Sequence, residues 1–191
     1  MSEQTWLVVG LGNPGPEYEK TRHNIGAMVT TTWAKRLGWK MSKHKKAQAI
    51  TAEGRFAGHK IVIAQPTTYM NSSGNAVASL QQFYKIDAAH TIALHDELDI
   101  PFEAIRMKIG GGDNGHNGLR SMRASVGTGD FYRVRLGIGR PPGQQDPAAF
   151  VLKAFSSAES KVLGVFCERA ADALETLIES GLDIAQSRYN Q

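Results

Sequence analysis

The sequence predicts one α/β domain in which helices flank a mixed, largely parallel central sheet. Apolar runs rich in β-branched residues alternate with segments of helical periodicity, the order typical of parallel strands joined by helices. The 191 residues contain no linker, internal repeat or low-complexity tract, so we expect a single domain over residues 1–191. Eleven of the 20 glycines lie in residues 10–15, 110–118 and 137–143. These stretches are predicted to be loops that bend sharply or approach a ligand closely.

Six apolar segments are predicted to be strands because they are short and bounded by turn-forming residues. They are residues 6–9, 47–52, 60–64, 91–94, 104–109 and 132–138. Helical spacing of apolar residues begins near Ile25 and continues to Leu37, where Gly38 ends it. A second helix is expected after the capping candidates Ser72 and Ser73.

The C-terminal segment carries the clearest helical pattern. Ser156 and Glu159 have the spacing of a capping box, and an apolar stripe follows over residues 162–178. Cys167 lies within this stripe, so we interpret it as a packed structural thiol.

The composition is that of a globular protein and excludes several classes. Hydrophobic residues make up 41% and charged residues 21%, which suits a packed core. No apolar run reaches the roughly 18 residues of a membrane span. The N-terminus carries Glu3 and no basic residue before the first apolar run, unlike a secretory signal. One cysteine can form neither an intrachain disulfide nor a Cys-rich zinc site. The expected location is the cytoplasm.

The net charge of +4 is unevenly distributed. Residues 1–150 hold 18 basic and 12 acidic side chains, whereas residues 151–191 hold 4 and 6. Residues 35–60 and 106–140 are the most basic stretches. If the fold places both on one face, that face would attract nucleic-acid phosphates, although an ordinary solvated surface explains the same numbers.

The first glycine-rich stretch, residues 10–15, matches the G-x-G-x-x-G pattern of dinucleotide-binding proteins. The pattern requires a helix that opens within the glycines, but Pro16 disfavours helical geometry at Gly15. The acidic residue expected about 20 positions later is also missing. We therefore predict no dinucleotide site.

His23 and Asp96 are candidates for a hydrolytic pair. His23 precedes the predicted helix at Ile25, whose positive end would keep the imidazole neutral and able to accept a proton. Asp96 follows an apolar strand and offers a carboxylate to orient that ring. Taken separately, His23 is typical of a surface or capping residue and Asp96 of a turn.

Three asparagines, Asn13, Asn71 and Asn117, are further candidates for the site. Asn13 and Asn71, like Asp96, come just past the carboxyl end of a predicted strand, the edge where α/β sheets bind ligands. Their amides could place a water or stabilise an oxyanion, although Asn71 alone is typical of a helix cap and Asn117 of a turn. The six histidines show no H-x-x-x-H pair and no G-x-S-x-G motif occurs, so neither a metal nor a serine nucleophile is expected.

Five separated blocks closely resemble the bacterial peptidyl-tRNA hydrolases, in that family's order. The blocks are residues 9–15, 18–24, 66–71, 95–99 and 110–118. The resemblance extends from about residue 6 to residue 140, and the helical tail fits as well. Two positions depart from the family, which usually has glycine in place of Asn114 and leucine in place of Ser72. Asn114 could stiffen or reshape the loop over the substrate.

The resemblance implies hydrolysis of the ester between a peptide and the terminal ribose of tRNA, by a monomer without metal or cofactor. It implies that His23 is the base and that Asp96 orients it. It assigns tRNA phosphate to Lys108 and Arg135, and the peptidyl and acceptor end to Asn13, Tyr18, Tyr69, Asn71 and Asn117. We expect the amides of Asn13 and Asn71 to help place water and the developing oxyanion. The alternative is a non-catalytic RNA-binding protein on the same fold, against which His23 and Asp96 argue.

Overall fold

A computed structural model describes residues 4–190 of the chain. Residues 1–3, which include Glu3, and residue 191 lie outside the described residues. The seven strands are β1 (Thr5–Gly10), β2 (Ser42–Lys43), β3 (Ala49–Phe56), β4 (His59–Pro66), β5 (Thr91–Glu97), β6 (Ile105–Ile109) and β7 (Tyr132–Gly137). The helices are α1 (Ile25–Leu37), α2 (Ser73–Tyr84), α3 (Asn117–Val126), α4 (Pro147–Val151), α5 (Ser157–Ser180) and α6 (Leu182–Tyr189).

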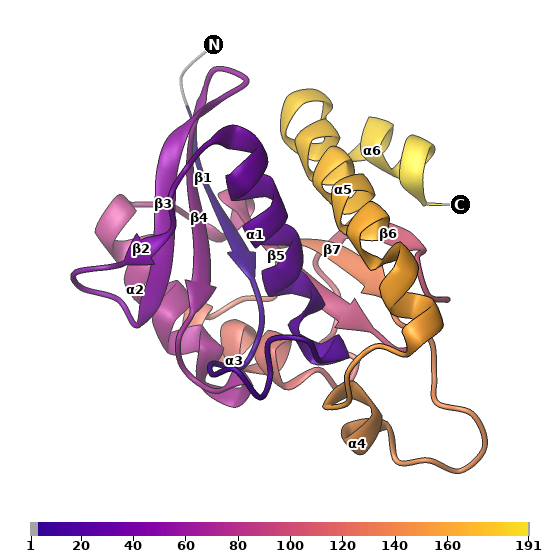
Figure 1. Cartoon of the computed structure of the whole chain (residues 1–191). Coiled ribbons are helices and arrows are strands. Elements are labelled where there is room, and N and C mark those ends of the chain that lie inside the picture. Colours follow the sequence, from indigo (N-terminus) through magenta and orange to yellow (C-terminus); the bar gives the residue numbers. More distant parts are fainter. Residues whose placement is uncertain (1–3, 191) are drawn as a thin grey trace.

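The strands form one mixed sheet in the order β2-β3-β4-β1-β5-β7-β6. Neighbours among β4, β1, β5 and β7 run parallel, whereas β2, β3 and β6 pair antiparallel at the two edges. This arrangement confirms the predicted α/β class with a mixed, largely parallel sheet. The arrowheads of the central strands point towards the end of the molecule where α4 lies (Figure 1).

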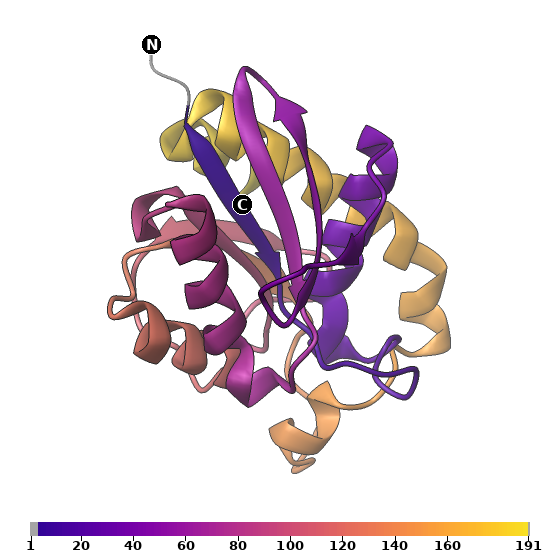
Figure 2. The same ribbon diagram turned by 90° about the vertical axis from the view of Figure 1, so that its left-hand side faces the viewer.

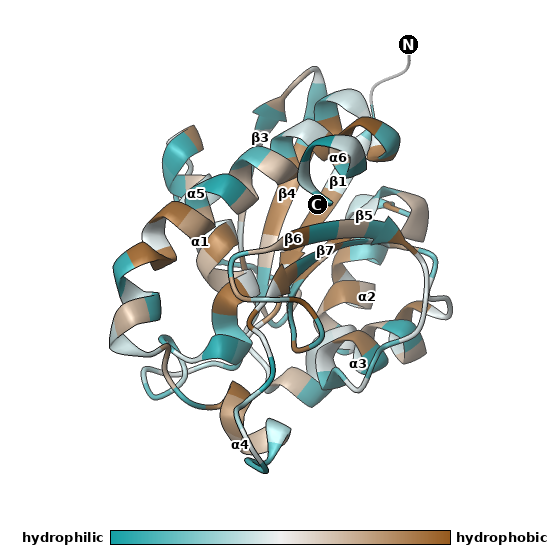
Figure 3. Ribbon diagram, turned by 90° about the vertical axis from the view of Figure 1, so that its right-hand side faces the viewer, coloured by the Kyte–Doolittle hydropathy of each residue, from teal (hydrophilic) through white to brown (hydrophobic). Residues whose placement is uncertain are grey.

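Helices cover both faces of the sheet. In β1, Val8 contributes to a core with α1 and α5, whereas Leu7 and Val9 contribute to a second core with α2 and α3. Figure 2 shows α2 and α3 together on the second face. Strands buried on both faces read as continuous apolar runs, which is why the central strands could be predicted. The outward turns of α5 and α6 include many hydrophilic residues (Figure 3).

All six predicted strands and all three predicted helices are present, but β2, α3, α4 and α6 were not predicted. β2 has two residues and α4 has five, too few to show a period. α3 follows directly from a glycine-rich loop, and only three of its residues are buried. The capping box between Ser156 and Glu159 is confirmed, with both hydrogen bonds present.

Cys167 is buried in α5, as predicted, and burial raises the pKa of its thiol to about 11. A thiol with so high a pKa is a poor nucleophile at neutral pH. Among the described residues, no helix is long and apolar enough to cross a bilayer.

The two basic stretches lie at opposite edges of the sheet. Residues 35–60 include β2 and β3 at one edge, and residues 106–140 include β6 and β7 at the other. The strands of the two stretches are therefore separated by β4, β1 and β5.

A close approach between α1 and β5 brings the first turn of α1 near the carboxyl end of the sheet. A Cβ atom on Gly26 would lie 2.1 Å from the carbonyl oxygen of Leu94. Since only glycine allows this distance, Gly26 lets the helix lie directly against the strand. His23 lies three residues before Gly26, and Asp96 lies two residues after Leu94. The contact between Gly26 and Leu94 therefore brings His23 and Asp96 together.

Candidate active site

His23 and Asp96 form a buried hydrogen-bonded pair. His23 lies in the 3-10 turn Arg22–Asn24 that leads into α1, and Asp96 is the penultimate residue of β5. The Nδ1 atom of His23 lies 2.9 Å from Oδ2 and 3.0 Å from Oδ1 of Asp96. The contact expected from the sequence is therefore present. Asp96 lies within β5 rather than past its end, because the strand continues to Glu97.

A second imidazole, His116, shares the carboxylate of Asp96. Its Nε2 lies 2.8 Å from Asp96 Oδ1. Its Nδ1 accepts hydrogen bonds from the backbone amides of Gly118 and Leu119 and so caps α3. Because Nδ1 is an acceptor, Nε2 must carry the proton and donate it to Asp96. No role for His116 was predicted from the sequence, in which it lies within the glycine-rich stretch, directly before Asn117.

The carboxylate of Asp96 sets the protonation of His23. Burial lowers the pKa of His23, but the attraction and the hydrogen bond of Asp96 outweigh burial, and the pKa lies above the usual 6.5. The helix terminus was expected to favour the neutral ring, but the pKa is raised, because the charge of Asp96 acts more strongly than the helix end. Burial raises the pKa of Asp96, yet the attraction of His23 and His116 holds it well below the usual range.

The neighbouring His95 does not share this role. Burial, together with repulsion from His116, lowers the pKa of His95 to about 3. Its Nδ1 faces the carbonyl oxygen of Asp96 at 2.8 Å. His95 is therefore a neutral, buried side chain that donates a hydrogen bond to the strand.

The His23, Asp96 and His116 cluster has the residue types of a metal site. Its hydrogen bonds do not suit a cation, because Nδ1 of His23 and Nε2 of His116 both point protons at Asp96. His116 cannot move its proton to Nδ1 without breaking the cap of α3. The donor set therefore fits a hydrogen-bonded triad.

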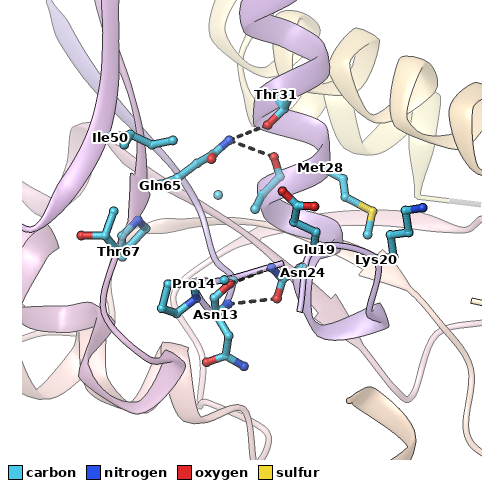
Figure 4. A pocket seen from close by; sticks show the side chains of 15 residues that line it. Asn13, Pro14, Glu19, Lys20, Asn24, Met28, Thr31, Ile50, Gln65 and Thr67 are labelled. Atoms are coloured by element: carbon cyan, nitrogen blue, oxygen red, sulfur yellow. Dashed lines mark hydrogen bonds between the residues drawn. The ribbon is translucent and has the colours of Figure 1, made fainter. Parts of the chain in front are cut away.

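Asn13 is held so that its amide nitrogen remains available. Its backbone exchanges two hydrogen bonds with the Asn24 side chain, of 2.9 and 3.0 Å (Figure 4). Its side-chain oxygen accepts a 2.7 Å hydrogen bond from the backbone amide of Met70. The oxygen is thus assigned by its donor, and Nδ2 has no partner among residues 4–190.

A cavity of about 610 Å³ lies over these groups. Of the residues expected to form the site, those that line it are Asn13, His23, Tyr69, Asn71, Asp96 and Asn117. Val151 and Leu152 provide an apolar wall at α4. Asn117 is the first residue of α3 rather than a turn residue. The edge of the sheet therefore gathers most of the predicted set around one cavity.

A second cavity of about 570 Å³ lies at the glycine-rich loop after β1 and is lined by Asn13, Asn24 and Gln65 among others (Figure 4). Here α1 begins at Ile25, well after Gly15. This loop therefore lacks the helix N-terminus that a dinucleotide pyrophosphate needs, as predicted.

Comparison with known proteins identifies the family. The family model described as "Peptidyl-tRNA hydrolase" matches residues 7–191. The chain belongs to the peptidyl-tRNA hydrolase family. It is 57% identical over 190 residues to the peptidyl-tRNA hydrolase of Rhodococcus erythropolis, with 100% of both chains covered. It is 55% identical over 184 residues to that of Mycobacterium tuberculosis, with 96% of both covered.

A crystal structure of the peptidyl-tRNA hydrolase from Acinetobacter baumannii has the same fold. The TM-score is 0.90 at 34% identity, and the match covers 98% of this chain and 96% of the other. The resemblance inferred from five sequence blocks is therefore confirmed over the length of the chain.

Tyr69 lines the cavity of this peptidyl-tRNA hydrolase family member, whereas Tyr18 does not. Its ring meets that of Tyr69 edge to face, with centroids 6.3 Å apart. Tyr69 is 59% exposed. We therefore place Tyr18 behind Tyr69, where it supports an exposed aromatic surface at the rim.

Lys108 and Arg135 also lie outside the cavity, on the adjacent strands β6 and β7. Arg135 forms an ion pair with Glu97, with 3.2 Å between its Nη2 and Oε1 of Glu97. Burial lowers the pKa of Lys108, and repulsion from Arg135 and Arg133 lowers it further. Arg133 itself is buried and donates to backbone carbonyls that include Gly111 and Gly129, so it has a structural role.

Proposed function

We propose that this chain hydrolyses the ester bond between the peptide and the terminal ribose of peptidyl-tRNA, with His23 as the base. The observation that carries this proposal is the buried pair of His23 and Asp96 beneath a 610 Å³ cavity, in a member of the peptidyl-tRNA hydrolase family. Nδ1 of His23 is directed at Asp96, and its Nε2 has no partner among the residues that the structure describes. That nitrogen is free to accept a proton from water.

The reaction follows from this geometry. Nε2 of His23 takes a proton from a water whose oxygen attacks the ester carbonyl, and Asp96 stabilises the imidazolium that forms. The tetrahedral intermediate then breaks at the bond to the ribose oxygen, which receives that proton. The products are a peptide carboxylic acid, which ionises, and tRNA with a free ribose hydroxyl. A base and correct orientation are sufficient for this ester.

The asparagines place the substrate in this proposal. Nδ2 of Asn13 donates to the carbonyl of the peptide that precedes the ester, and Asn71 helps to hold water and the developing oxyanion. Tyr69 and Asn117 bind the peptidyl and acceptor end, and Tyr18 supports Tyr69. The rival function, RNA binding without catalysis, has no use for a buried histidine held by a carboxylate.

The proposed setting is a monomer in the cytoplasm. The substrate belongs to translation, which supports the cytoplasm, and the resemblance to the family supports a monomer. Phosphates of the tRNA would bind Lys108 and Arg135, with no sequence preference and with strong salt dependence.

Asn13→Asp tests the role of Asn13 in substrate choice. Aspartate keeps an oxygen for the backbone amide of Met70 but replaces the free amide donor with a carboxylate. This should repel the peptide carbonyl and tolerate a free ammonium. We expect a loss of about 5- to 150-fold on N-acetylaminoacyl-tRNA, from one unpaired buried group, and a much smaller loss on aminoacyl-tRNA. The measurement is the ratio of kcat/KM for the two substrates.

Asn13→Ala is the matched variant, because it removes both the donor and the oxygen that binds the Met70 amide. Asn13→Ala should displace the loop and lower both rates by the same factor. If Asn13→Asp also lowers both rates by the same factor, the choice between N-acetylaminoacyl-tRNA and aminoacyl-tRNA does not depend on the amide donor of Asn13.

Lys108→Ala and Arg135→Ala should weaken capture of peptidyl-tRNA with little change in kcat. Each lost phosphate contact should reduce the slope of log K against log salt by about 0.7–0.9. Lys35→Ala is the control, because Lys35 lies in the last turn of α1, far along the helix from His23. An unchanged slope in both test variants would show that these residues do not bind phosphate.

A further inference from the structure

Asn114 connects the glycine-rich loop before α3 to the end of β5. Its Nδ2 donates to Oε2 of Glu97 at 2.7 Å and to Oδ2 of Asp99 at 2.8 Å. Its backbone has a φ of +49°, a left-handed conformation that asparagine tolerates better than most residues. Both protons of one amide nitrogen are thus used by two carboxylates.

The same carboxylates bind two arginines from other segments. Glu97 Oε1 accepts from Arg135 at 3.2 Å, and Asp99 Oδ1 accepts from Arg140 at 2.7 Å. The network, Arg135-Glu97-Asn114-Asp99-Arg140, therefore joins β7, the end of β5, the glycine-rich loop and the segment that follows β7. Asn114 is the residue through which the glycine-rich loop joins this network.

The network lies at the rim of the catalytic cavity. Asn114, Glu97 and Arg140 all line that cavity, and Glu97 directly follows Asp96. Glycine at residues 110–112 and 115 makes this loop costly to order. Two hydrogen bonds to charged acceptors are strong enough to hold such a loop in one arrangement before substrate arrives.

We propose that Asn114 is a positioning residue for peptidyl-tRNA: it holds the glycine-rich loop against Glu97 and Asp99, so that the rim is ordered before the substrate binds. This inference rests on the proposed function. It predicts a role in substrate binding rather than in the chemical step, because Asn114 contacts neither His23 nor Asp96.

Asn114→Gly tests the inference without adding backbone strain, because glycine accepts the positive φ. We expect KM for N-acetylaminoacyl-tRNA to rise about 5-fold, from the cost of ordering the loop on binding, with kcat little changed. Hydrogen exchange of residues 110–116 should become faster. Ala57→Gly, which replaces another exposed residue of positive φ in the β3–β4 turn, should change neither quantity.

Asn114→Asp provides a second, pH-dependent test. This variant keeps the size of the side chain but places a third carboxylate beside Glu97 and Asp99. Like charges at this distance favour uptake of a shared proton, and a protonated carboxyl can donate in place of the amide. The KM ratio of Asn114→Asp to the unaltered protein should therefore be largest near about pH 8 and should fall towards about pH 5.5.

The outcomes separate this inference from the proposed function. If the unaltered protein does not hydrolyse the substrate, the proposed function is wrong. If it does, and both variants keep its KM and its exchange rates, Asn114 does not order the rim. A double-mutant cycle between Asn114→Gly and Asp99→Asn should be less than additive, and full additivity would also contradict the inference.

Discussion

His23→Ala should lower kcat for N-acetylaminoacyl-tRNA by about 10²- to 10⁴-fold, the range for loss of a general base. Affinity for the substrate should change little, because a group that only moves a proton in the transition state adds little to ground-state binding. The measurements are single-turnover rates and equilibrium binding of the same tRNA. His90→Ala, at the other end of β5, is the histidine control. Retention of most activity by His23→Ala would overturn the proposed mechanism.

The pH dependence of the unaltered protein provides a check on the same residue. A base must be neutral to accept a proton, and the pKa of His23 is raised above 6.5 by Asp96. Activity should therefore rise with pH and level off only above that raised pKa. A profile whose midpoint lies below 6.5 would indicate that His23 is not held as the structure shows.

Asp96→Asn should lower kcat by roughly 10²-fold or more, because it should hold His23 in the tautomer that cannot accept a proton from water. An asparagine oxygen could still accept from Nε2 of His116, but its amide group would then point hydrogens at Nδ1 of His23. His23 must respond by moving its own proton to Nε2, the nitrogen that has to accept a proton from water. The midpoint of the pH profile should also move lower, because the charge that raises the pKa of His23 is gone.

Asp96→Ala separates the two effects of the carboxylate. It removes the charge without presenting a donor to His23, so the ring can keep its productive tautomer part of the time. We expect a milder loss than in Asp96→Asn, with the same downward movement of the midpoint. A rate and a pH profile unchanged in both variants would mean that Asp96 does not act on His23 during the reaction.

Much of the architecture could be predicted from local sequence. Strands β1, β4 and β5 are buried on both faces and therefore read as continuous apolar runs. α5 displays its capping box and its stripe within a single segment. That Asn13, Asn71 and Asp96 collect at one edge could be anticipated, because parallel strands deliver their carboxyl ends to the same edge of a sheet.

The environment of those two residues was decided by tertiary structure. His23 and Asp96 are 73 positions apart, and His116 lies a further 20 along the chain. The raised pKa of His23 depends on a carboxylate that only folding brings near, so the sequence alone led us to expect a shift in the opposite direction. In the same way, the free amide of Asn13 depends on Met70, and the network of Asn114 depends on Glu97 and Asp99.

By itself, then, the sequence of this protein determined six of the seven strands in the described residues, the long helices and the edge of the sheet where polar side chains collect. Those features follow from periodicity and turn chemistry, which act over a few neighbouring residues. Which donor meets which acceptor was decided only when distant segments packed together. Charges and hydrogen bonds act over a few ångströms of space, whatever the separation along the chain.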